Sequence, residues 1–303
     1  PPPPPLSPAP PPPPTNTTAK SSAASDVYKR QANVGRKFFY QPSVASQDGK
    51  VYVCFNSGDR EHPLNLPVVD RLYCIKDYYD KYDYANISGF DNHTTADGVN
   101  ESDLVDVTTN VLQLDTSTQT DLDVVLGKLN SNPTYRVDPT TGLPDDGGSF
   151  YYGWFIKLDG KDRVLVTGDY GEKALASPVI FQGEVFFSTY QIKTGTRSTC
   201  EAGNLGYSRL CRVALETGEA VFNYDLVNDT ESTSGNDRAV DADGGVLRRT
   251  DRVYQLGEGI PSGIVQVVDA AGNVSLLISS SDKVEGIGGS NPTMTFPLYW
   301  IQW

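Results

Sequence analysis

The fold of this chain is decided by the stretch Ser57-Gly58-Asp59-Arg60-Glu61-His62-Pro63-Leu64. It follows an alternating apolar run, 50–56, that is typical of a β-strand, and a second strand-like run begins after Asp70. A glycine and a proline between two such runs indicate a turn followed by a polar loop. The sequence therefore predicts two consecutive strands joined by this loop.

The residue types in the loop have separate expected roles. Gly58 is expected to supply an unusual backbone dihedral, and Pro63 to stiffen the exit from the loop. Asp59 or Ser57 is expected to cap backbone amides of the turn. The two charged residues that follow Asp59 are expected to remain solvated.

The segments around this loop repeat one pattern, in which a short turn containing glycine joins two apolar strands as in a β-hairpin. Three copies occur, at 42–53, 178–187 and 261–277. The first two copies are each followed by a further strand, at 71–75 and 209–213. We expect the second copy to close with another hairpin at 215–222, where a Thr-Gly pair supplies the turn.

Four antiparallel strands per unit, repeated along a chain, are typical of β-propeller blades. β-Branched and aromatic residues dominate these positions, and long amphipathic helical patterns are scarce. The sequence therefore predicts an all-β fold over 32–303, a partial β-propeller of several four-stranded antiparallel blades with long loop insertions. The longest insertion, 77–147, is expected to be a surface excursion, apart from a short helix at 121–130.

Several motifs occur in an order that resembles the C-terminal propeller domain of the PilY family, the large surface proteins of bacterial type IV pili. Beside the opening stretch they are Gly35-Arg36-Lys37-Phe38-Phe39-Tyr40, Gly153-Trp154-Phe155-Ile156, Gly171-Glu172-Lys173-Ala174-Leu175-Ala176-Ser177-Pro178 and Gly257-Glu258-Gly259-Ile260-Pro261-Ser262. The resemblance runs from about Gly35 to the C-terminus. The family-motif residues that it assigns here are Ser57, Gly58, Asp59, Arg60, His62, Pro63, Gly171, Glu172 and Lys173.

The resemblance implies a non-enzymatic role in type IV pilus assembly, in the control of pilus retraction and in adhesion. The implied partners are pilins and minor pilins. The implied location is the cell surface or the extracellular fimbrium, after export. The chain begins without a basic region and an apolar stretch, so we expect its signal peptide and true start to lie upstream. A partial propeller leaves sheet faces uncovered, and we therefore expect it to be insoluble or unstable alone.

Calcium is the cofactor that the resemblance implies. The family's calcium loop reads Asp-x-Asp/Asn-x-Asp-Gly-x-x-x-Asp, in which carboxylates on alternate residues reach one ion. The nearest stretch here supplies the candidate ligands Asp237, Asp241 and Asp243. It lacks a third carboxylate at the right offset and a closing acid, so the main calcium site is expected upstream. A solvated acidic turn is the alternative.

Two other classes of function stay open. The first is a carbohydrate-binding or host-binding surface adhesin, which an exposed, aromatic-lined loop would favour; the aromatic stretches 151–155 and 296–303 are instead expected to be core strands. The second is a quinoprotein-like propeller enzyme, because the turn at 215–218 also occurs there, but its cofactor constellation is not visible.

We expect no enzymatic activity from the remaining motifs. A hydrolase would need a Gly-x-Ser-x-Gly elbow, which the sequence lacks. Ser57, Asp59 and His62 lie within one loop, too close in sequence for the geometry of a nucleophile, a base and an orienting acid.

The charge of the chain excludes some partners. The formal net charge is -13, and residues 1–31 hold three basic residues and one acidic residue, so the remainder carries -15. An acidic chain with two histidines is unsuited to nucleic acid or an anionic membrane surface and is suited to cations. No apolar run approaches bilayer length, so no membrane span is expected.

The four cysteines match neither a zinc ribbon nor a redox motif. Cys200 and Cys211 flank a glycine-containing loop in a protein expected to be exported, and we predict a disulfide between them. Cys54 and Cys74 lie in consecutive strands that should pair, where a bridge is the alternative to two buried thiols. We favour the buried thiols.

The first 31 residues read differently from the rest. Residues 1–14 are nearly pure proline, which forms a polyproline II rod or coil and builds no core. Residues 26–31 can be read as the translation of GAT GTG TAT AAG AGA CAG, an adapter used in preparing sequencing libraries. We therefore expect 1–31 to be a disordered assembly artefact, with a natural Pro-rich linker as the alternative.

Overall fold

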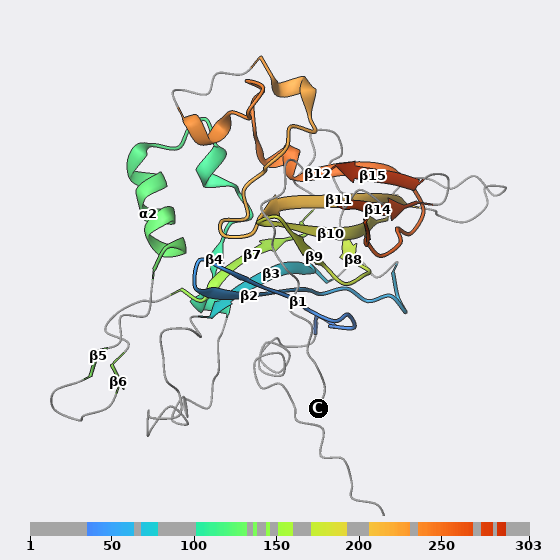
Figure 1. The fold of residues 1–303 in the computed structure, drawn as a ribbon, viewed down its shortest axis with the longest axis horizontal. Helices are drawn as coiled ribbons and strands as arrows, with labels where there is room; N and C mark the ends of the chain where they lie inside the picture. Colours follow the sequence, from blue (N-terminus) through green and yellow to red (C-terminus); the bar gives the residue numbers. More distant parts are fainter. Residues whose placement is uncertain are drawn as a thin grey trace, which may run out of the picture.

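The structure is a computed structural model that describes residues 35–63, 68–77, 101–131, 136–137, 144–145, 151–159, 171–192, 206–230, 236–268, 274–280 and 284–288. Within these ranges the fold is dominated by antiparallel β-sheets (Figure 1). The expectation of an all-β fold is therefore confirmed. The Pro-rich segment 1–31 lies outside the described residues.

The first sheet has the strand order β1-β2-β3-β7-β4. The bounds in that order are Ser43–Gln47, Lys50–Asn56, Arg71–Asp77, Gly153–Lys157 and Val105–Asp106. The strands β1, β2, β3 and β7 form an antiparallel meander, and β4 joins β7 in parallel. Asp48 and Gly49 connect β1 to β2 with φ angles of 52° and 71°, the left-handed conformations of a two-residue hairpin turn.

The second sheet repeats this arrangement. Its strands are β8 (Lys173–Ala174), β9 (Val179–Phe181), β10 (Glu184–Gln191), β11 (Tyr207–Ala214) and β12 (Val253–Glu258). The order is β12-β11-β10-β8, and β9 also pairs with β10. Gln182 and Gly183 join β9 to β10 with φ angles of 53° and 78°, as in the first hairpin. The first two repeated hairpins and the strands that follow them are thus confirmed.

The expected hairpin at 215–222 is wrong in its second strand. The turn forms, since Gly218 N donates to Ala214 O at 2.9 Å, but pairing stops at one bridge between Val213 and Ala220. The side-chain amide of Gln113 takes both backbone groups of Ala220, each at 2.9 Å. The fourth strand of the sheet is instead β12, reached after the 3-10 helices Leu226–Asn228, Asp237–Ala239 and Arg249–Arg252.

The third sheet is smaller, with strands β13 (Val265–Val268), β14 (Val274–Ser279) and β15 (Val284–Gly288) in sequential antiparallel order. The β13–β14 hairpin is the third copy of the repeat predicted from the sequence. A separate pair, β5 (Arg136–Val137) and β6 (Pro144–Asp145), forms a two-stranded sheet.

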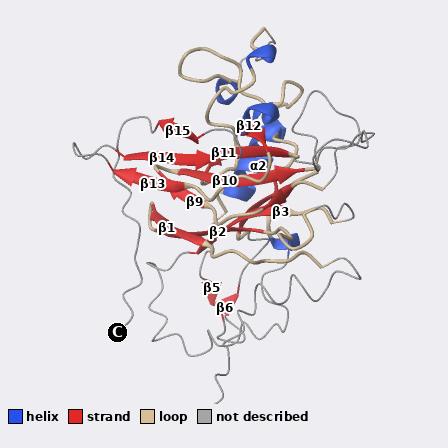
Figure 2. Cartoon of the chain, turned by 90° about the vertical axis from the view of Figure 1, so that its right-hand side faces the viewer, coloured by secondary structure: helices blue, strands red, loops and turns tan. Residues whose placement is uncertain are grey.

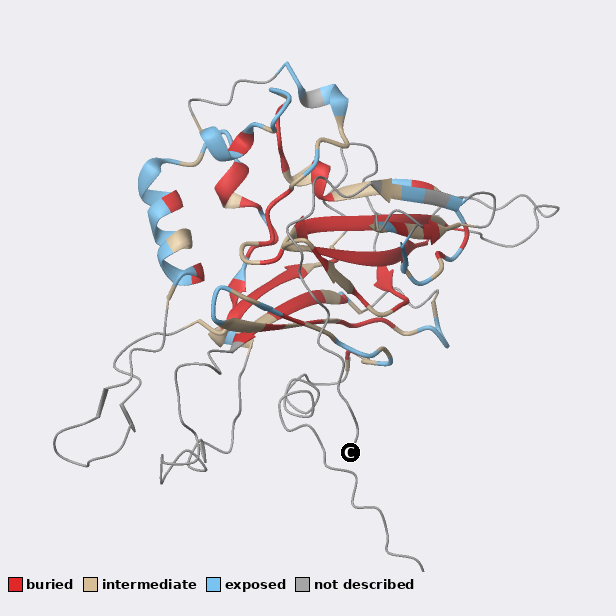
Figure 3. Cartoon of the chain, in the orientation of Figure 1, coloured by how far each residue is buried: buried red, intermediate tan, exposed pale blue. Residues whose placement is uncertain are grey.

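The three main sheets stack face to face, with the second sheet in the middle (Figure 2). Alternate residues of β10 point to opposite sides, so that Phe187 packs toward the first sheet and Phe186 toward the third. We call the contact between the first and second sheets the first junction, and that between the second and third sheets the second junction. Figure 3 shows the resulting burial of β10 and β11.

The insertion 77–147 departs from the expected surface excursion over 101–131. Helix α2 (Gln119–Leu129) confirms the predicted short helix and begins with a capping box between Thr118 and Asp121. Leu112 and Leu122, together with β4, contribute to the main core. The apolar residues of this segment are diluted among polar ones, which obscures their pattern in the sequence.

Candidate functional site

The candidate site is the place where the loop after β2 meets the segment Gly171–Pro178, although the two lie more than one hundred residues apart. The loop that follows β2 packs against β8, and Ala174 N donates to Ser57 O at 3.3 Å. A Cβ atom at Gly58 would overlap the carbonyl oxygen of Ala174. Gly58 is therefore required by close approach of the two backbones, and not by the unusual dihedral that the sequence suggested, because its φ is not positive.

A buried polar network joins the motifs behind this contact. Ser57 Oγ donates to Asp70 Oδ1 at 2.8 Å and accepts from Arg71 N at 2.9 Å. The other oxygen of Asp70 lies 3.4 Å from Lys173 Nζ, and both side chains are at most 2% exposed. Burial raises the pKa of Asp70 above its ordinary value, although the positive charge of Lys173 opposes this rise.

The neighbouring motif residue makes a second buried ion pair. Glu172 Oε2 lies 2.6 Å from Arg209 Nη1, and Thr189 Oγ1 donates to Glu172 Oε1 at 2.5 Å. Consecutive residues of one motif thus reach different sheets, Lys173 the first and Glu172 the second. Asn56 adds a link across the same junction by donating to Ala176 O at 2.8 Å.

The exposed part of the loop is organised by Asp59. Its Oδ1 accepts from the backbone amides of Glu61 and His62 at 3.1 and 3.2 Å. Lys37 Nζ lies 2.8 Å from Asp59 Oδ2. Burial would raise the pKa of Asp59, but hydrogen bonds from Lys37 and His62 outweigh it and hold the pKa below its ordinary value. The expected capping role is confirmed, and the neighbouring Arg60 is exposed as predicted.

Residues of this loop line two hollows. The polar hollow, of about 300 Å³, is lined by Gly35, Lys37, Asp59, His62, Val68 and Asp70. The aromatic hollow, of about 230 Å³, is lined by Phe39, Tyr40, Arg60 and Glu61. Neighbouring loop residues therefore line different hollows. Each hollow combines charged groups of the loop with residues of the segment 35–40.

The structure does not assemble Ser57, Asp59 and His62 into a triad. Ser57 is fully buried, and its hydroxyl is engaged with Asp70 and Arg71. His62 is exposed, and its Nδ1 lies 3.2 Å from Asp59 Oδ2. Ser57 therefore has a structural role, and His62 lies at the surface beside Asp59.

Metal ligands gather at a place the sequence did not single out for that purpose. Among the described residues, Asp59, Glu61 and His62 each present a ligand atom within 4.8 Å of the other two. The Asp59 carboxylate already contacts the ammonium group of Lys37, which competes with a cation. A cation bound through Oδ2 of Asp59 would therefore compete with Lys37.

The predicted calcium ligands lie elsewhere, between β11 and β12. Asp241 Oδ1 accepts from Asp243 N at 3.0 Å and from Gly245 N at 2.6 Å, which closes the expected acidic turn. Asp237 lies in a 3-10 helix, and Asp243 is exposed. Calcium at Asp237, Asp241 and Asp243 stays a prediction, as does the main site upstream.

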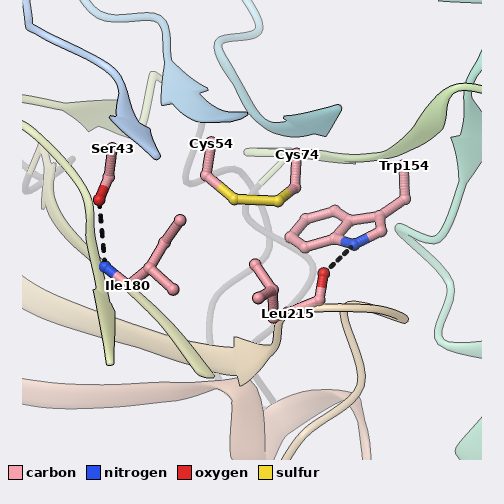
Figure 4. Close-up of a disulfide and its surroundings, with 6 residues drawn as sticks. All are labelled: Ser43, Cys54, Cys74, Trp154, Ile180 and Leu215. Carbon is pink, nitrogen blue, oxygen red and sulfur yellow. Dashed lines mark hydrogen bonds between the residues drawn. A yellow bond between two sulfur atoms is a disulfide. The ribbon is translucent and has the colours of Figure 1, made fainter. Parts of the chain in front are cut away.

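The cysteines differ from the favoured expectation. Cys54 and Cys74 face each other in the β2–β3 register and form a disulfide, not two buried thiols. Figure 4 shows the bridge beside Trp154, whose indole Nε1 donates to Leu215 O at 2.9 Å across the first junction. Cys211 is buried in β11, and Cys200 lies outside the described residues, so their predicted disulfide stays a prediction.

The remaining motif positions are structural. Within the predicted core strand 151–155, Trp154 and Phe155 are buried in β7, whereas Tyr151 and Tyr152 are half-buried and precede the strand. Gly171 has a φ of 92°, in the left-handed region that favours glycine. Pro63 is half-buried at the end of the described part of the loop, and residues 296–303 lie outside the described residues.

Lys37 lies in the quoted motif at 35–40 and Asp70 stands directly before β3, but no local pattern indicated that Lys37 contacts Asp59 or that Asp70 contacts Ser57 and Lys173.

Comparison of this chain with protein-family models, with curated proteins and with solved structures finds no match. No helix within the described ranges is long and apolar enough to cross a membrane.

Proposed function

We propose that this chain is part of a PilY-like, pilus-associated surface protein, and that its fold is a partial β-propeller. Its role would be non-enzymatic: it supports type IV pilus assembly, opposes retraction and contributes to adhesion through contacts with pilins and minor pilins. Calcium would act on this role mainly from a site outside the described residues.

One observation carries the proposal, namely the use of the motif residues as a link between stacked sheets. Ser57, Asp70 and Lys173 form a buried network between two successive four-stranded meanders, β1-β2-β3-β7 and β9-β10-β11-β12. Successive meanders that stack face to face are the arrangement of neighbouring propeller blades. Residues that hold neighbouring blades together suit a binding scaffold better than an enzyme, because the side chains of Ser57, Asp70 and Lys173 are all engaged with one another.

Binding to pilins tests this proposal directly. The purified chain would be immobilised and exposed to purified type IV major and minor pilins, with and without calcium, while biolayer interferometry records binding. We expect saturable binding to at least one pilin. Absence of binding to every pilin, by a chain that circular dichroism shows to be folded, would overturn the proposal.

A second candidate function, glycan binding, is favoured by the aromatic hollow. Phe39 is 50% exposed beside Arg60 and Glu61, and an exposed ring next to charged groups can stack on a sugar face while its neighbours bond the hydroxyls. This candidate is tested on a glycan array with the wild type and Phe39→Ala, and we expect the variant to lose signal. Phe222→Ala is the matched control, because Phe222 is 47% exposed and lies outside the hollow. Equal signals from all three proteins would remove this candidate.

A further inference from the structure

The pair of Lys173 and Asp70 places an amine and a carboxyl group in contact where water is excluded. Lys173 Nζ lies 3.4 Å from Asp70 Oδ2, and the two side chains are 0% and 2% exposed. In water such groups stay charged and do not react with each other. A buried site favours the uncharged amine and acid, because isolated charges are costly to remove from water.

The surroundings of Asp70 favour the uncharged form of its side chain. Burial raises the pKa of this carboxyl group above its ordinary value, although the positive charges of Lys173 and Arg36 oppose the rise. Transfer of one proton from the ammonium group to the carboxylate gives a neutral amine beside a neutral acid. A neutral lysine amine is a nucleophile, and the protonated oxygen of the acid can leave as water.

Ser57 distinguishes the two oxygens of Asp70. Its hydroxyl donates to Oδ1 at 2.8 Å and is itself held by Arg71 N, which donates to Ser57 Oγ at 2.9 Å. A fixed donor at this position stabilises the negative charge that develops on Oδ1 when an amine attacks the carboxyl carbon. Oδ2, the oxygen next to Lys173, is therefore the one that leaves.

We propose that Lys173 and Asp70 condense to form an intramolecular isopeptide bond once the first and second sheets are in contact. A bond forms between Nζ of Lys173 and Cγ of Asp70, and the bond between Cγ and Oδ2 breaks. Oδ2 leaves as water with one proton from the acid and one from the amine, so the step consumes no oxidant, reductant or other reactant. The product joins residues 103 positions apart and prevents the first junction from opening at this point.

Mass spectrometry of the intact chain, reduced and denatured, tests for the bond. We expect the wild type to be lighter than its sequence by one water molecule. A mass equal to that of the sequence, in a preparation that circular dichroism shows to be folded, would overturn the proposal and leave an ion pair only. This measurement uses the wild type and does not depend on the folding of any variant.

Tryptic digestion locates the missing water. Trypsin releases the peptide 61–71, which contains Asp70, and cuts the segment 164–193 after Lys173 only where that lysine carries a free amine. We expect 61–71 joined to an uncut 164–193. Loss of water without this branched peptide would place the dehydration at another side chain and would also overturn the proposal.

Substitution of two lysines separates this pair from an exposed one. Lys173→Met should restore the full mass of its sequence, because the nucleophile is absent. Lys157→Met is the matched control, since Lys157 forms an ion pair with Asp106 in which both side chains are more than a third exposed. It should keep the loss of water. Retention of the loss by Lys173→Met, or its disappearance in Lys157→Met, contradicts the assignment.

The rate at which the branched peptide accumulates during cell-free synthesis tests the role of Ser57. Ser57→Ala should slow accumulation by about 100-fold, because Oδ1 loses its donor. Ser57→Thr keeps the hydroxyl and should restore the rate. Circular dichroism confirms that the variants are folded. Equal rates for the wild type and folded Ser57→Ala would contradict a role of Ser57 in the step.

Discussion

The first and second junctions use different chemistry to hold the same middle sheet. The first contains a disulfide and the buried pair of Asp70 and Lys173, which joins the two sheets, together with the buried pair of Glu172 and Arg209 within the second sheet. The second contains a cluster of apolar side chains such as Phe186, Leu256 and Leu276, and the ion pair on this face, Arg212 with Glu184, stays within the second sheet. An apolar contact tolerates repacking, whereas a buried ion pair fixes which atoms must meet. The loop after β2 and the segment that begins at Gly171 thus meet where the contact is specific.

The strongest way to break this contrast is to leave one buried charge of the first junction without its partner. Lys173→Met should lower the free energy of unfolding by about 3–5 kcal/mol, because the carboxylate of Asp70 remains buried and unpaired. Urea denaturation measures the loss. The double variant Asp70→Asn with Lys173→Met should recover much of it.

An exposed ion pair in the same sheet provides the control for this prediction. Lys157 Nζ lies 2.6 Å from Asp106 Oδ2, and their side chains are 36% and 40% exposed. Asp106→Asn should cost at most about 1 kcal/mol. Equal losses from the buried and exposed pairs would show that the buried network is not what stabilises the first junction.

The disulfide should make the first junction alone sensitive to reductant. Cys54 and Cys74 enclose a sequence separation of 20, for which loss of the bridge costs about 3 kcal/mol. We expect a reducing agent to lower the denaturation midpoint of the wild type and to have a smaller effect on the variant Cys54→Ala with Cys74→Ala. An effect that remains in the double variant would support the predicted bridge between Cys200 and Cys211, and equal effects on the two proteins would contradict a contribution of Cys54–Cys74.

The second junction should respond to a cavity, and less strongly. Leu276 is 1% exposed, and Leu276→Ala should cost about 2–3 kcal/mol, the low part of the usual range because the thin third sheet can relax toward the space. Thermal unfolding gives the value. Val227→Ala, at a side chain that is 82% exposed, should change stability by less than about 0.5 kcal/mol.

The smallest expected effect is a pH dependence confined to the first sheet. Burial lowers the pKa of Lys76 to about 8, while its ammonium donates to Leu129 O and Ser131 O. Between this value and the ordinary value of 10.5 the unfolded chain binds more protons, so stability rises with pH through this window. The full difference between the two pKa values corresponds to about 3 kcal/mol, and solvent screening of this partly accessible group reduces the expected gain to the order of 1 kcal/mol.

Comparison with Lys76→Met isolates this effect from other groups that titrate in alkali. The denaturation midpoint of the wild type, relative to that of the variant, should increase from pH 8 toward pH 10.5. Parallel curves for the two proteins would show that Lys76 makes no contribution to the pH dependence.

Local features of the fold could be predicted from the sequence. The hairpins at Asp48-Gly49 and Gln182-Gly183 were found because a two-residue turn depends on residues next to each other. The helix at 119–129 was found because its cap and its spacing are also local. Each of these predictions uses information contained within a few residues.

Features that depend on distant contacts could not be predicted in this way. The fourth strand of the second sheet lies beyond three 3-10 helices, and the side chain of Gln113 stops the nearer segment from pairing. Lys173 and Asp70 are 103 residues apart, and neither neighbourhood identifies the other. The loop of the candidate site was therefore predicted from the sequence, but its contact with the segment 171–178 was not.

The long sequence separation between these two segments also determines the order in which their contacts can form during synthesis. Asn56 cannot form its hydrogen bond until Ala176, which is 120 residues later in the chain, has been synthesised. Asp70 likewise cannot pair with Lys173 until that residue has been synthesised. Until those later residues are synthesised, the polar side chains of Asn56 and Asp70 have water as a partner in place of Ala176 and Lys173. Contacts of such high sequence separation slow folding and prolong the exposure of strand edges. A protein built this way gains from a chaperone that binds the nascent chain, because its first sheet stays incomplete until the second sheet has been synthesised.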